Sequence, residues 1–273
     1  MSEFLDHPAF QGGVAPFVVA LIAAFALGRS RFVWLAIMPA YATMVALDTG
    51  FSLFPPTVAR KTWLIGLLAP LAGIAADRYK RSSRRISLLI VAAVGLLSLW
   101  VFRTVLENRE GTAAAVAGAG IALFVAAMVA VVLRLCDDGI RCGAAGVGLG
   151  IAAGIAGILS ASIGALVAGV AIAAACAAML LFQILLARTL APGFPGALPI
   201  GLIVALIAAG THQLALLPWY ALPLMLLVPL AVSLPAPKPG PLFSRAAVLA
   251  ACALAAAVFP IGAAWYAALS SVS

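Results

Sequence analysis

Charged residues are scarce in this sequence. Only 9% of its 273 residues are Asp, Glu, Lys or Arg, whereas 66% are hydrophobic and the mean hydropathy is +1.22. A soluble domain is about half apolar and a quarter charged. Since a chain this apolar cannot cover itself with polar surface in water, most of it must lie in lipid. Its apolar runs are continuous rather than alternating, which excludes a membrane β-barrel and predicts an all-α polytopic integral membrane protein.

Residue types that carry catalysis are also few. The sequence has only two histidines, His7 and His212, and it contains no HExxH, GxSxG or P-loop motif. No expected membrane span holds a Glu, Lys or Arg near its middle, the usual position of a proton or ion pathway. We therefore expect neither an enzyme, nor a cofactor, nor ion-coupled transport. An intramembrane enzyme acting on lipid is the least favoured alternative, since it has little beyond Asp48, Tyr41 and Met44 on one helical face.

The four cysteines do not form a pattern typical of a disulfide framework. Cys176 and Cys252 lie in apolar runs and are interpreted as small packing residues. Cys136 and Cys142 flank two aspartates in the stretch CDDGIRC, but neither a CxxC nor a histidine spacing accompanies them. We expect no metal site.

Long apolar runs are what the sequence has in quantity. A spanning helix needs roughly 20 apolar residues, and the runs predict a single transmembrane domain over residues 1–273 with about ten helices. Eight or nine crossings are the alternatives, because some runs are short and the division between the eighth and ninth is weak. The expected spans are 13–28, 32–54, 62–77, 85–103, 112–134, 143–161, 164–187, 197–211, 217–235 and 244–269.

The basic residues indicate the orientation of the chain, because Lys and Arg accumulate in cytoplasmic loops. With both termini outside (N-out/C-out), twelve of the 16 basic residues fall in inside loops and four fall outside: Arg60, Lys61, Arg103 and Arg109. This rule accounts for the net charge of +8, so we expect the lipid bilayer and no nucleic acid as a partner. The run DRYKRSSRR makes the 78–85 loop a candidate contact for anionic lipid headgroups. The Ala-, Gly- and Leu-rich composition favours a bacterial inner membrane.

Asp48 is a carboxylate at the end of an apolar run, in the stretch ALDTGFSLFPP. It follows Arg31 by 17 residues, or about 26 Å of helix, which places it near the outer boundary of a hydrocarbon core about 30 Å thick. There the carboxylate reaches water or pairs with Arg60 or Lys61. A structural role at the interface is the main interpretation. The alternative is a gate or binding group at an outer mouth, for which the candidate residues are Asp48, Tyr41, Thr49 and His212.

Small residues recur every four positions in two neighbouring expected spans. Such a spacing forms a groove that lets another helix approach closely, either within the chain or from another subunit. The candidate helix-packing residues are Gly146, Gly150 and Gly154 in the sixth span and Ala165, Gly169 and Ala173 in the seventh.

Two functions remain open on these observations. The first is a compact carrier or permease for an apolar or weakly polar small molecule, since the expected spans have a poor polar lining. The alternative is a non-catalytic subunit, scaffold or assembly factor of a larger membrane complex. Prolines interrupt the second, third, ninth and tenth expected spans; we interpret them as ordinary kinks, with freed backbone groups along a transport path as the alternative.

Overall fold

The computed structural model describes residues 7–28, 30, 32–48, 50–51, 54–78, 84–235 and 241–270. These residues form helices and their connections, with no β-strand among them. Eight helices are long and apolar enough to cross a membrane, so the chain is an all-α, multi-pass membrane protein in a lipid environment. The elements are η1 (Phe10–Val14, a π-helical turn), α2 (Ala15–Leu27), η2 (Val33–Ala36, a 3₁₀-helix), α3 (Ile37–Asp48), α4 (Val58–Arg78), α5 (Arg84–Leu106), α6 (Gly111–Leu133), α7 (Gly139–Leu159), α8 (Ile163–Leu185), α9 (Gly193–Leu214), α10 (Ala221–Met225), α11 (Leu227–Ser233) and α12 (Leu242–Ser270).

Two of the ten expected spans are shorter than the sequence indicates. The run 32–54 forms only Val33–Asp48, because Gly50 adopts a positive φ of 66° and its N–H bonds back to the carbonyl of Val45, which ends α3. The run 217–235 forms the short pair α10 and α11, divided at Leu226. Pro229 has no N–H to donate to the turn before it, which explains this break. The remaining eight expected spans correspond to the eight long helices.

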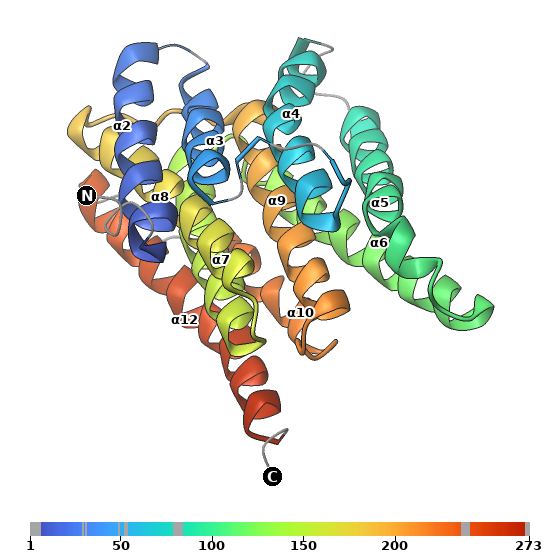
Figure 1. The fold of residues 1–273 in the computed structure, drawn as a ribbon. Coiled ribbons are helices and arrows are strands. Elements are labelled where there is room, and N and C mark those ends of the chain that lie inside the picture. Colours follow the sequence, from blue (N-terminus) through green and yellow to red (C-terminus); the bar gives the residue numbers. More distant parts are fainter. Residues whose placement is uncertain are drawn as a thin grey trace.

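Successive helices run in opposite directions, with α10 and α11 together making one pass (Figure 1). The described part of the chain therefore has two ends. We name one of them the basic end, because Arg78, Arg134, Arg141, Arg188 and Arg245 lie there, in the terminal turns and connections of their helices. The opposite end carries Arg60, Lys61, Arg103 and Arg109.

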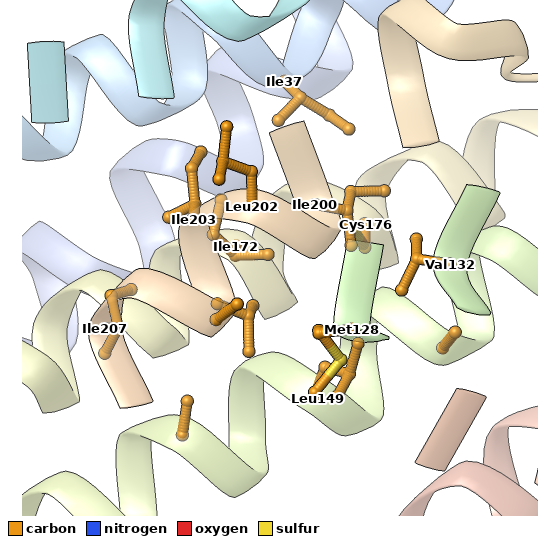
Figure 2. Close-up of a cluster of buried hydrophobic side chains, with 14 of the residues drawn as sticks. Ile37, Met128, Val132, Leu149, Ile172, Cys176, Ile200, Leu202, Ile203 and Ile207 are labelled. Atoms are coloured by element: carbon orange, nitrogen blue, oxygen red, sulfur yellow. The ribbon is translucent and has the colours of Figure 1, made fainter. Parts of the chain in front are cut away.

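Helix α9 occupies the centre of the bundle. Every residue from Gly193 to Ala209 is buried. Figure 2 shows the reason: Ile200, Leu202, Ile203 and Ile207 of α9 meet apolar side chains from several other helices. Those partners include Ile37 of α3, Met128 and Val132 of α6, Leu149 of α7, and Ile172 and Cys176 of α8. By contrast α5, α6 and α12 leave large apolar side chains exposed, as lipid-facing helices do.

Helices α7 and α8 pack with almost no side chain between their backbones. A methyl group built on Gly150 would lie 2.5 Å from the carbonyl oxygen of Gly169 and 2.6 Å from the backbone nitrogen of Ala173. One built on Gly169 would lie 2.6 Å from the backbone nitrogen of Gly154. The same contact continues at both ends of the pair, where Gly146 faces Cys176 and Gly157 faces Ala165. Of the small residues named from the sequence, Gly150, Gly154, Gly169 and Ala173 thus meet one another within this chain, whereas Gly146 meets Cys176 and Ala165 meets Gly157.

Contacts between distant segments join the described part of the basic end. The indole N–H of Trp34 donates to the carbonyl of Leu190 at 2.9 Å, and the N–H of Gly193 donates to the carbonyl of Cys136 at 2.9 Å. Asp138, the N-cap of α7, also forms an ion pair with Arg245 of α12. These contacts join the start of η2, the two connections that flank α7 and α8, and the start of α12.

Candidate functional site

A cavity of about 250 Å³ lies at the end of the bundle opposite the basic end. We name it the Asp48 cavity. Its walls come from the last turns of α3, the first turns of α4, the turn between α7 and α8, the start of α8 and the last turns of α9. The lining residues used below are Tyr41, Met44, Asp48, Ala59, Thr62, Trp63, Ser162 and Thr211.

Two of the four residues expected at an outer mouth line this cavity. Tyr41 and Asp48 are seven positions apart on α3, so they lie on the same helical face. Both line the cavity. Tyr41 is buried, whereas Asp48 is exposed at the helix end. The carboxylate therefore lies where the cavity opens and the phenol lies deeper.

The other polar side chains of the lining are largely committed to their own helices. The Thr62 hydroxyl donates to the carbonyl of Val58, and the Thr211 hydroxyl donates to the carbonyl of Ile207. Trp63 is 7% exposed, and its indole N–H has no hydrogen-bond partner in the described structure. The wall is thus mostly apolar, and Asp48 is the one described lining residue that carries a charge.

Of the two expectations for the Asp48 carboxylate, contact with water and pairing with Arg60 or Lys61, the structure shows an exposed residue and no such pair among the described residues. The Arg60 guanidinium donates to the carbonyl of Pro55 at 3.0 Å. The Lys61 ammonium lies 3.4 Å and 3.5 Å from the carbonyl oxygens of Trp100 and Val101. Among the described residues, no hydrogen bond or ion pair holds the Asp48 carboxylate.

Lys61 lies in helix α4, and not in the loop that the sequence predicts. Helix α4 begins at Val58, four residues before the expected span, because Thr57 accepts a hydrogen bond from the N–H of Arg60 as an N-cap does. This places Lys61 in the first turn of α4, where it is 8% exposed, and its ammonium lies 5.1 Å from the centroid of the Trp100 ring. The sequence signal for this earlier start is the Pro-Pro-Thr stretch before Val58.

His212 is next to Thr211 in sequence but does not join the Asp48 cavity. Its Nδ1 lies 2.8 Å from the carbonyl oxygen of Leu217, and the residue lines a second cavity of about 880 Å³ between α6, the end of α9 and α10. This second cavity is walled by apolar residues such as Phe124 and Leu222. Thr49, the remaining residue expected at the mouth, lies outside the described residues.

The cysteines lie apart from both cavities. Cys142 and Cys176 are buried near the α7–α8 contact, Cys136 is half-buried in the connection before α7, and Cys252 is exposed on α12. Across the described ranges, no three His, Cys, Asp or Glu side chains come together in a way that would hold a metal ion.

The geometry as a whole is that of a small, mostly apolar chamber with one carboxylate at its opening. Comparison with known proteins adds no family to this description: no protein-family model, curated protein or solved structure matches the chain.

Proposed function

We propose that this chain is a compact membrane carrier that takes a small, mostly apolar solute into the Asp48 cavity. The observation that carries the proposal is a cavity that opens at one end of the bundle, opposite the end where contacts join distant segments of the described chain. Carriers that work by alternating access expose a central site to one side of the membrane at a time. The contacts of Trp34 with Leu190 and of Asp138 with Arg245 support the proposal, because they tie distant segments together at the other end.

The alternative function, a scaffold subunit, relied on small-residue faces that another protein could cover. Gly150 and Gly169 face each other within the chain, so this pair of helices does not present them to a partner. The carrier therefore accounts for the cavity and for the packing together. Purification tests the alternative that the chain is a subunit of a larger complex, since a scaffold should co-purify with stoichiometric partners.

The orientation of the chain in the membrane follows from the charge distribution. Since the basic end carries most of the Lys and Arg, we place it in the cytoplasm of a bacterium, with the chain in the inner membrane and both termini outside. The Asp48 cavity then opens to the outside. Arg78 and Arg85, at the edges of the 78–85 loop, lie at the level of the cytoplasmic headgroups and favour anionic lipid there.

The proposal is tested by filling the cavity. Ala59 is an exposed residue in the first turn of α4 and lines the cavity, so Ala59→Trp places an indole in the chamber. Ala119 is an exposed residue of α6 outside both cavities, and Ala119→Trp is the matched control. Purified protein is screened with small solutes for thermal stabilisation, and the solutes that stabilise it are assayed for uptake into proteoliposomes.

We expect a solitary, monodisperse protein whose uptake is lost in Ala59→Trp and kept in Ala119→Trp. Equal uptake by the two variants would refute a transport path through the Asp48 cavity. Purification with a fixed partner, and no uptake of any stabilising solute, would favour the scaffold instead.

A further inference from the structure

We propose that the solute of the Asp48 cavity is a small organic cation, a primary or secondary amine in its ammonium form with an apolar body. This inference rests on the proposed function, because it assigns a chemical class to the solute of the same cavity. The starting observation is a carboxylate at the opening with no counter-ion among the described residues. The two bases closest in sequence, Arg60 and Lys61, are engaged with backbone carbonyls elsewhere.

A carboxylate beside an apolar wall favours a ligand of opposite charge. Partial removal from water weakens the hydration of Asp48, and an ammonium group restores both a hydrogen bond and a charge partner. An anionic ligand would meet like-charge repulsion at the opening. A neutral ligand would leave the carboxylate unpaired as it displaced water from the cavity.

The wall behind Asp48 suits the rest of such a molecule. The aromatic rings of Tyr41 and Trp63 line the cavity, and cations are attracted to the faces of aromatic rings. Met44 adds a polarisable thioether to the lining. The single negative charge of Asp48 balances the single positive charge of an ammonium group. The apolar side chains around Asp48 can contact the alkyl or aryl part of the same solute.

A metal ion fits this lining poorly. Calcium takes six to eight oxygen ligands and magnesium near-octahedral oxygen ligation, whereas the described lining offers one carboxylate. The chemistry on the wall therefore favours an organic cation over an inorganic one.

The test uses three probes of one shape and different charge: 2-phenylethylamine, 2-phenylethanol and 3-phenylpropionate. Binding to the purified full-length chain is measured at pH 7 by thermal stabilisation over a concentration series. Uptake of the same probes is measured in proteoliposomes. We expect the amine to bind at least tenfold more tightly than the alcohol, the ratio that one charge-assisted hydrogen bond provides, and the propionate to bind most weakly.

Three variants separate the carboxylate from general surface charge. Asp48→Asn keeps the shape and removes the charge, so the amine and the alcohol should bind equally. Asp48→Glu keeps the charge and should retain a preference for the amine. Glu110→Gln removes a carboxylate at the same end of the bundle but outside the cavity, and the preference should not change.

Different outcomes overturn different claims. If the alcohol binds the wild-type chain as tightly as the amine, or if Asp48→Asn keeps the preference, the charge assignment is wrong while the cavity remains a solute site. If Glu110→Gln abolishes the preference, the attraction is a property of the surface and the assignment is again wrong. If no probe binds to protein that elutes as a folded species, the Asp48 cavity is not a solute site, and the proposed function fails together with the inference.

Discussion

A single added methyl group at the α7–α8 contact should separate two helices. Gly150→Ala places a Cβ atom 2.5 Å from the carbonyl oxygen of Gly169, about 0.9 Å inside the 3.4 Å at which ordinary van der Waals contact begins. The atoms in the way are backbone atoms of α8, including the nitrogen of Ala173 at 2.6 Å, so no side chain can rotate to make room. The helices must move apart or bend.

The magnitude follows from two opposing effects. Overpacking a close contact costs about 1–3 kcal/mol of stability. Replacing a helical glycine with alanine stabilises the helix by up to about 1 kcal/mol. The matched control is Gly262→Ala on α12, where a new Cβ meets no atom within 4 Å and only the second effect applies. The propensity gain cancels between the two variants, and Gly150→Ala should be about 1–3 kcal/mol less stable than the control.

The assay is unfolding in mixed micelles by titration with SDS, followed by tryptophan fluorescence. Gly169→Ala should behave like Gly150→Ala, because its Cβ would lie 2.7 Å from the carbonyl oxygen of Gly150. The double variant should lose less than the sum of the two losses, since the first methyl group already separates the helices. Equal midpoints for Gly150→Ala and Gly262→Ala would refute the reasoning, because α7 and α8 would then separate without loss.

Two further predictions concern the basic end. Asp138→Asn keeps the helix cap, since Asn caps as well as Asp, but it removes the charge that faces Arg245 and, at 3.3 Å, Arg141. Because Asp138 is partly exposed, we expect the variant to lose about 1 kcal/mol of stability, and this loss should shrink in high salt. An SDS midpoint equal to that of the wild-type chain would contradict this prediction. For the orientation, a membrane-impermeant thiol reagent should label Asn108→Cys in intact cells above the wild-type background and Ser30→Cys only after permeabilisation. The reverse pattern would place the basic end outside.

The helices themselves were largely predictable from the apolar runs. Eight expected spans correspond to long helices, and the two short passes differ for identifiable local reasons. Gly50 ends α3 by taking a positive φ, and Pro229 interrupts the pass formed by α10 and α11. Glycine is tolerated within other helices of this chain, so its presence after Asp48 does not by itself predict a stop.

The candidate site was predictable only in part. Tyr41 and Asp48 share a helical face seven residues apart, so the periodicity of one helix brings them together. Thr62, Ser162 and Thr211 come from three segments, 100 and 49 residues apart in the chain, and no local pattern connects them. His212 fails to join the site because neighbouring residues on a helix point in different directions, and its partner is the carbonyl of Leu217.

The sequence by itself determined the lipid environment, the helical class and the helices that alternate across the bundle. These follow from hydropathy and charge, which are properties of short segments and can be read one segment at a time. The tertiary structure alone decided that α9 lies at the centre, that α7 and α8 meet backbone to backbone, and that Asp48 faces a cavity instead of Arg60 or Lys61. In lipid, one apolar helix face is as well solvated as another, so neighbours are chosen by the fit of shapes between distant segments.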